Sequence, residues 1–160
     1  MSSNAFLKID GISGESKDAA HKGWIDVESF DFGAIQPSNM ASGGGGGAGK
    51  VKYDDLAIFT YVDKATPTLF KYASNGKHIS KVELSIHKAG GDSIEYLRIV
   101  LEEVIITEAR YNGTLSQSKV PVLYKFSAAQ IKHQYWEQTD KGGKGSEVSA
   151  GWSIKENKEV

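Results

Sequence analysis

Alternation of apolar and polar residues with a period of two runs through most of the sequence and limits the possible folds more than any other feature. Successive side chains of a strand point to opposite faces of a sheet, so alternate residues share one face. The last such segment is typical of an antiparallel strand with one side in water. Its apolar residues would share one face and its small or polar residues the other: Val148, Ala150, Trp152 and Ile154 against Ser149, Gly151, Ser153 and Lys155. Similar patterns predict strands at 5–9, 24–32, 51–61, 79–87, 96–111 (bent at Glu102–Glu103), 120–126 and 129–136.

One short helix interrupts the strands, and specific residues mark its ends. Thr66 can serve as the N-cap, and Pro67 can occupy the first turn because its missing N–H needs no partner there. Asn75–Gly76 provides a left-handed stop, so the helix is predicted at 66–75. A helix of two turns is marginal alone, so its apolar side must pack on a sheet. The sequence therefore predicts one mainly β domain over residues 1–160, an antiparallel β-barrel or sandwich with one short lateral α-helix.

Turn residues separate the predicted strands. Asn112–Gly113 is the pair favoured in a tight type I′ hairpin, and residues 89–92 and 140–145 are predicted loops. Residues 37–50 form an extended Ser/Gly-rich loop with six of the 18 glycines between Gly43 and Gly49. A loop this long inside a compact domain usually has a function.

Charge and composition exclude several classes of protein. The 19 Lys and Arg residues balance 20 Asp and Glu, so the chain lacks the positive field of a nonspecific nucleic-acid binder. Even the most apolar stretch, 97–106, contains three charged residues, so no window approaches the roughly 20 apolar residues of a membrane-spanning helix. The first ten residues have neither a basic leader nor a Sec-type apolar core. The protein is therefore expected to start in the cytoplasm without a cleaved signal peptide.

Motifs for catalysis, cofactors and metals are weak. Gly44–Lys50 matches the first part of a Walker A motif, but Val51 stands where magnesium binding needs Ser or Thr, and a strand is predicted where a helix should follow. The acidic pairs at 54–55 and 102–103 would point to opposite faces of their strands and could not readily share a proton. The four histidines lack metal-ligand spacing and are expected at the surface or in turns: His21, His78, His87 and His133. No catalytic, cofactor-binding or metal-binding residue is predicted, and the chain is not expected to be an enzyme.

The predicted strand at 96–101 carries apolar residues on both faces. Leu97, Ile99 and Leu101 share one face, and Tyr96 and Val100 lie on the other. The barrel interior can cover one face, but a single short helix cannot cover the outer faces of every such strand. Part of this surface is therefore expected to be buried by another chain.

A set of short motifs then follows a familiar order over nearly the whole chain. Its members are Phe6–Gly11, Gly14–Asp18, His21, Ile25–Val27, the glycine-rich loop ending Gly47–Lys50, Thr66–Pro67, Gly76–His78, Lys88–Gly91, Glu95–Leu97 and Gly151–Trp152. This ordered set resembles Hcp, the haemolysin-coregulated protein family of type VI secretion.

The resemblance implies a β-barrel subunit that assembles into a homohexameric ring. Rings would stack into the inner tube of a contractile injection machine, with a sheath around the tube and a spike protein at its tip. The protein would be exported with the tube and would carry and chaperone effector proteins in the lumen. The absence of cysteine suits a protein that moves from a reducing to an oxidising space.

Two sets of residues are candidates for these contacts. Both phases of the strand at 24–32 mix polar and apolar residues, and its smaller polar end, Ser29 and Asp31, is the candidate lumen surface for effectors. Ordering a glycine loop costs about 1–2 kcal/mol per residue, so the loop is expected to become ordered against the neighbouring ring. The ring-stacking candidates are Gly43, Gly44, Gly45, Gly46, Gly47, Ala48 and Gly49.

Two other functions remain open at this point. A small monomeric β-barrel could hold an apolar small molecule in its interior. An enzyme would depend only on the half-matched glycine loop, which a nucleotide-binding assay would test. Oligomeric state separates the tube subunit from the monomeric barrel.

Overall fold

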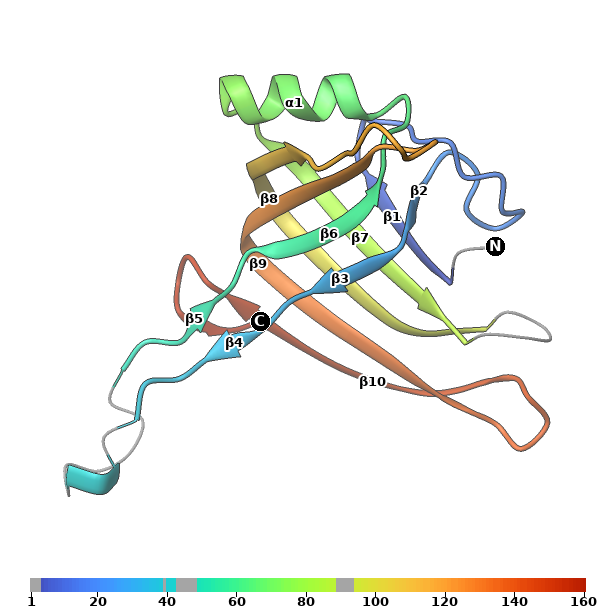
Figure 1. Ribbon diagram of the computed structural model, residues 1–160. Helices are drawn as coiled ribbons and strands as arrows, with labels where there is room; N and C mark the ends of the chain where they lie inside the picture. The colour runs from blue at the N-terminus through green and yellow to red at the C-terminus, as the bar shows by residue number, and fades with distance from the viewer. Residues whose placement is uncertain (1–3, 39, 43–48, 89–93) are drawn as a thin grey trace.

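The computed structural model describes residues 4–38, 40–42, 49–88 and 94–160 (Figure 1). The strands dominate, with one α-helix and one short 3-10 helix. In chain order the elements are β1 Ala5–Ile9, β2 Ile25–Val27, β3 Ser29–Asp31, β4 Ala34–Ile35, η1 Met40–Ser42, β5 Lys52–Tyr53, β6 Leu56–Tyr61, α1 Thr66–Asn75, β7 Ile79–His87, β8 Glu95–Tyr111, β9 Pro121–Gln138, β10 Lys144–Ser153 and β11 Lys158–Glu159.

The strands form a barrel whose two walls share the long strands β8 and β9 (Figure 1). One wall has the order β2-β1-β7-β8-β9-β10-β11, and every pair in it is antiparallel. The other wall is built from β3, β6 and the first half of β9. β9 pairs with β6 over 121–126 and with β10 over 130–138, so it passes from one wall to the other. The predicted fold class, a mainly β antiparallel barrel with one lateral helix, is confirmed.

The barrel is closed by bends in its long strands. Glu103 has a φ of 51°, and the ladders of β8 with both neighbours skip it, which places a bend where the acidic pair predicted one. The interior is filled with side chains from both walls. Those that are almost wholly buried include Leu7, Leu56, Leu84, Leu101, Val104, Tyr124, Phe126 and Ile131.

Helix α1 covers one end of the barrel, and its start differs from the prediction. The N-cap position is Ala65 rather than Thr66, and its side chain makes no capping bond. Thr66 is the first helical residue, and its hydroxyl oxygen accepts hydrogen bonds from the Asp63 N–H (3.0 Å) and the Tyr124 hydroxyl (2.7 Å). The predicted stop is correct, because Gly76 has a φ of 67° and its N–H bonds the Tyr72 carbonyl.

The segment predicted as one strand at 24–32 is two strands, β2 and β3, separated by a bend at Glu28. β2 pairs with β1 in one wall, and β3 pairs with β6 in the other. In β2 the side chains of Ile25 and Val27 face the interior. In β3 the side chain on the interior face is Phe30, which pairs with the buried Ile58. The inward phase therefore switches at the corner, which explains why both phases of the sequence mix polar and apolar residues.

Two further expectations, one about strand boundaries and one about a turn, are wrong. The segments predicted as separate strands at 120–126 and 129–136 are one continuous strand, β9, because it must cross between the walls. Asn112–Gly113 does not form a two-residue type I′ turn. β8 and β9 are joined by the longer loop 112–120, which is closed by a bond from the Asn112 N–H to the Pro121 carbonyl and by a turn at Thr114–Gln117.

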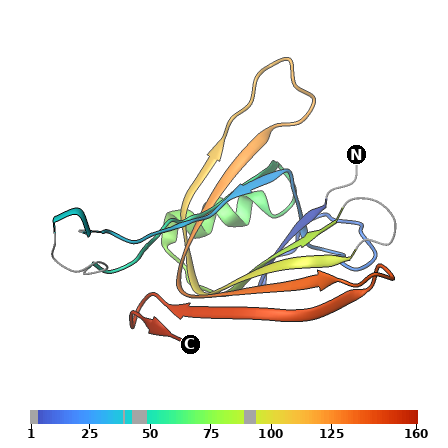
Figure 2. The same ribbon diagram turned by 90° about the horizontal axis from the view of Figure 1, so that it is seen from below.

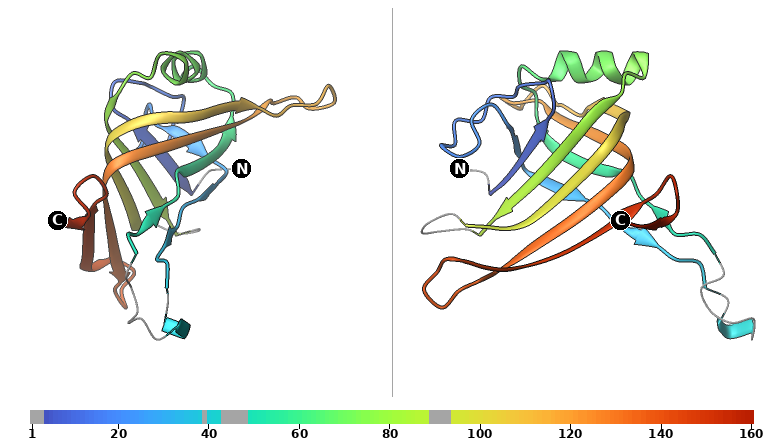
Figure 3. Two further views of the ribbon diagram at one scale, coloured as in Figure 1. Left: turned by 90° about the vertical axis from the view of Figure 1, so that its left-hand side faces the viewer. Right: turned by 180° about the vertical axis from the view of Figure 1, so that it is seen from behind.

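Two extensions leave the barrel in different directions (Figures 2 and 3). One is the loop 112–120 at the end of β8 and β9. The other contains β4, η1 and β5, and we call residues 34–53 the arm. In the part of the chain that the structure describes, no helix has the length and apolarity needed to cross a membrane.

Candidate functional site

The most unusual surface of the barrel is the edge formed by β10. In the ladder with β9, Val148 pairs with Tyr135 and Trp152 with Ile131, so the predicted apolar phase does share one face. The prediction that this strand has one buried side fails near its start, because β10 is the edge strand of its wall there: Val148 is at the outer end of the row that runs through Tyr135 and Leu97. Val148 is 67% exposed and Tyr135 is 44% exposed. Among the described residues, β10 has a second strand partner only at Trp152 and Ser153, so an edge with apolar side chains lies open.

A second apolar surface lies on the opposite wall. Phe30 on β3 and Phe59 on β6 are large aromatic side chains that remain partly exposed, on opposite faces of this wall. The lumen candidates of the sequence share the face of Phe59, because Ser29 pairs with Phe59 and Asp31 with Ala57, and both are exposed. By contrast, Val100, which was expected to need cover from another chain, is already buried. Its register neighbours are Glu83 and Lys132, whose long stems can cover apolar surface.

The arm carries the glycine-rich loop. Gly49 packs so closely on Pro37 that a Cβ atom would lie 2.8 Å from the proline Cγ. Ile35 and Met40 expose apolar side chains along the arm. At its base, a cavity of about 390 Å³ is lined by Val51, Tyr53 and Trp152, and the Trp152 indole N–H is buried without a hydrogen-bond partner in the described structure. The other stacking candidates, residues 43–48, lie outside the described residues.

The half-matched Walker A motif ends in this same arm. β5 begins two residues after Lys50, so a strand follows the glycines, as predicted. The helix N-terminus that receives phosphate in a P-loop is therefore missing from the residues described here.

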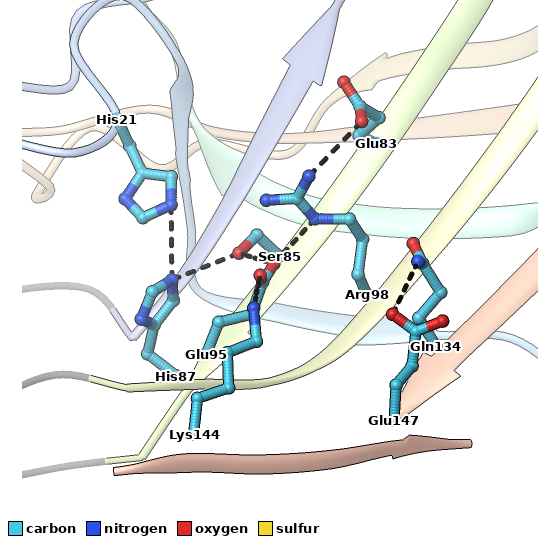
Figure 4. Close-up of polar contacts among 9 residues, drawn as sticks. All are labelled: His21, Glu83, Ser85, His87, Glu95, Arg98, Gln134, Lys144 and Glu147. Carbon is cyan, nitrogen blue, oxygen red and sulfur yellow. Dashed lines mark hydrogen bonds and ion pairs between the residues drawn. The ribbon is translucent and has the colours of Figure 1, made fainter. Parts of the chain in front are cut away.

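A network of polar side chains covers the outer face of the sheet between β7 and β10 (Figure 4). Its centre is the carboxylate of Glu95, which accepts bonds from the Ser85 hydroxyl (2.6 Å), Arg98 Nε (2.7 Å) and Lys144 Nζ (3.0 Å). Burial raises the pKa of Glu95, but these three bonds outweigh it and hold the pKa below its ordinary value. Lys144 also lies 3.6 Å from the ring centroid of Trp136. The network therefore ties β7, β8 and β10 together.

Replacing Glu95 with Gln should destabilise the fold by about 2 kcal/mol at pH 7, because Arg98 and Lys144 would lose a buried partner. A carboxyl whose pKa is lowered on folding stabilises the folded state at pH values above its ordinary pKa of 4.5. This contribution is lost as the pH falls through the lowered pKa of the folded protein. The difference between the two proteins should therefore shrink below about pH 4. Urea unfolding at pH 7 and pH 3.5 measures this.

A matched control is Glu108→Gln, whose ion pairs with Arg110 and Lys125 are exposed and should matter little. Equal stability of Glu95→Gln and wild type at pH 7 would contradict the role of the network.

Two of the four histidines are not where the sequence placed them. His21 is 4% exposed and His87 is 9% exposed, and their Nε2 atoms are 3.2 Å apart. His21 Nδ1 lies 2.6 Å from an Asp18 carboxylate oxygen. His78 is exposed as expected, whereas His133 is half-buried and burial lowers its pKa. The pair was missed because its members are 66 residues apart and the topology alone brings them together.

The histidine pair does not create a catalytic or metal site. Ser85 Oγ lies 3.1 Å from His87 Nε2, but Ser85 is wholly buried and its hydroxyl donates to Glu95. A buried hydroxyl with this partner has no access to a substrate. Within the described ranges, no group of three or more His, Cys, Asp or Glu side chains could hold a metal ion.

A cavity of about 670 Å³ lies outside the barrel interior, beside β2 and the end of β6. Charged and polar groups line much of it, including Glu15, Asp18, Asp26 and Glu28. Asp63 also faces this cavity, and burial raises its pKa. The interior itself is packed with side chains, so the described structure offers no apolar chamber for a small molecule. Open edges rather than a cavity distinguish this barrel.

Comparisons with known proteins agree with this geometry. A family model described as "Type VI secretion system effector, Hcp" matches residues 6–135. Protein hcp1 of Pseudomonas aeruginosa is 40% identical over 159 residues, covering 98% of both chains. Among solved structures, Hcp1 from Salmonella typhimurium has 34% identity and a TM-score of 0.83 with both chains fully covered. A structure described as a type six secretion system protein has 28% identity and a TM-score of 0.91 over 98% of both chains.

A packed antiparallel barrel with a lateral helix, a projecting arm and open edges defines a class of β-barrel subunits that act through their surfaces. The chain belongs to the Hcp family of type VI secretion system proteins. It is a secreted tube or effector protein of that system, as predicted, and the alternative of a small-molecule barrel is not supported.

Proposed function

We propose that this chain forms a homohexameric ring and that stacked rings make the inner tube of the type VI machine. In a closed ring each contact is heterologous, so one surface of a subunit meets a different surface of the next. The β10 edge with Val148 and Tyr135 is one such surface, and the face of the β3–β6 wall that carries Phe30 is the other. The open β10 edge carries the proposal, because a free apolar edge invites aggregation unless a partner covers it. Multi-angle light scattering tests it: a ring has six times the subunit mass of 17.3 kDa.

The remaining partners follow from this assembly. Loop residues Gly43–Gly49 contact the next ring, a spike protein meets the end of the tube and a contractile sheath surrounds it. The protein leaves the cytoplasm with the tube, without a cleaved signal peptide, and has no enzymatic activity of its own. This proposal is supported by the family membership, by the arm that projects from the barrel and by the balanced charge of the chain.

Effector proteins are carried in the lumen, and Ser29 and Asp31 form part of the surface that contacts them. Both side chains are exposed on the outer face of β3, so they are free to meet a partner in the described structure. Replacing Asp31 with Arg should leave the ring mass unchanged and reduce effector co-purification by about tenfold, which is the effect of about 1.4 kcal/mol. Asp140→Arg, in the turn between β9 and β10, makes the same charge change elsewhere and should have no effect. Intact rings with undiminished effector would contradict this role of Asp31.

A further inference from the structure

The loop at residues 11–24 connects β1 to β2 and lies over the outer face of the sheet. Hydrogen bonds within the loop hold its own shape, from the Gly14 N–H to the Gly23 carbonyl and from the Ser16 N–H to the Trp24 carbonyl. His21 joins the loop to the sheet, because its ring stacks on Phe6 of β1 with centroids 4.3 Å apart. The same ring meets His87 of β7 edge-on. Contact between two histidines is therefore part of what fixes the loop to the sheet.

The protons of this contact can be counted. Asp18 accepts a hydrogen bond from His21 Nδ1 at 2.6 Å, so that nitrogen carries a proton. The two Nε2 atoms at 3.2 Å make a hydrogen bond when one of them carries the proton and the other accepts it. A proton on His87 Nε2 would also lie beside Ser85 Oγ at 3.1 Å, because the proton of Ser85 goes to Glu95. If both Nε2 atoms were protonated, two N–H groups would face each other, and the His21 ring, protonated at both nitrogens, would carry a positive charge. Both rings are buried, so water cannot relieve this repulsion while the contact persists.

The surrounding charges do not titrate in the same range. Hydrogen bonding to His21 lowers the pKa of Asp18, and Glu95 also has a lowered pKa, so both carboxylates keep their charge where an imidazole titrates. Glu95 is further engaged by ion pairs from β8 and from the start of β10. The other charged groups on the elements around the pair are Lys8 on β1, Asp26 on β2, Glu83 on β7, Arg98 on β8 and Lys144 on β10. Lys8 and Arg98 lie over the ring of Trp24, which contacts His21 edge-on.

We infer that His21 and His87 form an acid-sensitive latch that holds the loop at 11–24 against the sheet. The latch is closed while at most one of the two facing Nε2 atoms carries a proton, and it opens when both do. Opening would free the part of the loop that carries Asp18, which lines the 670 Å³ cavity, while Glu15 still accepts a hydrogen bond from the Lys64 N–H (2.7 Å). This inference stands on the contact within one subunit and is independent of ring formation.

Hydrogen–deuterium exchange of the loop at pH 7.4 and pH 5.2, corrected for the intrinsic pH dependence of exchange, tests the latch. We expect protection of residues 11–24 to fall by about tenfold or more in the wild-type protein at acidic pH. In His87→Gln the fall should be less than about twofold, because a Gln amide can donate to neutral His21 or accept from protonated His21. An equal acidic loss in His87→Gln, or none in the wild type, would overturn the latch.

Two control variants test whether a titrating group other than the histidine pair causes the acidic loss of protection. His78→Gln removes an exposed histidine and should keep the full acidic loss of the wild type. Asp63→Asn replaces a half-buried carboxyl but keeps an oxygen that can accept the Ala65 N–H, and it should also keep the acidic loss, because protonation of a carboxyl with a raised pKa favours the folded state in acid. Loss of the acidic effect in either control would overturn the assignment to the histidine pair.

A measurement on the unmodified protein covers the case in which His87→Gln fails to fold. The imidazole carbon-bound protons of His21 and His87 can be followed by NMR from pH 8 to pH 4.5. A coupled pair takes up its two protons in separate steps, and both rings respond to each step. Two independent single-step titrations would overturn the latch.

Discussion

Replacing Val148 with lysine should convert rings into single subunits of 17.3 kDa. Val148 is largely exposed on the open β10 edge, so the substitution should change the stability of the monomer by less than about 0.5 kcal/mol. At the interface it would bury a charge among apolar side chains, which typically costs 2 kcal/mol or more at a central contact. A closed hexamer contains this contact six times, so the penalty is repeated around the ring. Light scattering across a range of concentrations measures the result.

A control substitution and a second variant make this test specific. Leu115→Lys changes a fully exposed apolar residue in the loop 112–120, away from both proposed surfaces, and should keep the ring. Phe30→Lys, on the face of the β3–β6 wall that would receive the β10 edge, should break the ring as Val148→Lys does. Rings of normal mass in Val148→Lys would show that the β10 edge is not the subunit interface.

Deleting Gly43–Gly49 should leave single rings intact and abolish stacked tubes. The described core is built from residues outside this loop, so folding and ring mass should not change. Stacking should fail because this loop would make the contact with the next ring. The cost of ordering it, about 1–2 kcal/mol per residue, is recovered only in that contact. Negative-stain electron microscopy at high protein concentration distinguishes rings from tubes.

The matched control for the deletion keeps the length of the loop and changes only its composition. Replacing Gly44 and Gly46 with Ser preserves a flexible chain of the same reach and should still allow tubes to form. Tubes of normal length from the deletion variant would refute the role of the loop in stacking. Loss of rings in that variant would place the loop at the subunit interface instead.

Much of the fold could be predicted because local patterns specify it. β1 and β7 have the bounds that period-two alternation gave, and α1 ends at the Asn75–Gly76 stop because only a residue tolerant of positive φ fits there. The switch of the inward phase at Glu28 could not be read from periodicity, since it depends on β2 and β3 pairing in different walls. The continuity of β9 and the length of loop 112–120 depend on the same closure of the barrel.

The candidate surfaces were predicted less well than the fold. An apolar phase in β10 was visible in the sequence, but its exposure at Val148 depends on β10 being the edge strand of its wall. Two-sided apolarity at 96–101 predicted cover from another chain; Val100 is covered within the subunit, whereas Tyr96 is half-buried. The contact between His21 and His87 joins a loop to a distant strand, and no spacing rule in the sequence could identify it.

The mass and shape of the purified wild-type protein are the most direct test of a subunit that works by closing on copies of itself. Light scattering with negative-stain microscopy should give annular particles with six times the mass of 17.3 kDa. A particle of 17.3 kDa at every concentration, with a small molecule bound, would contradict this function.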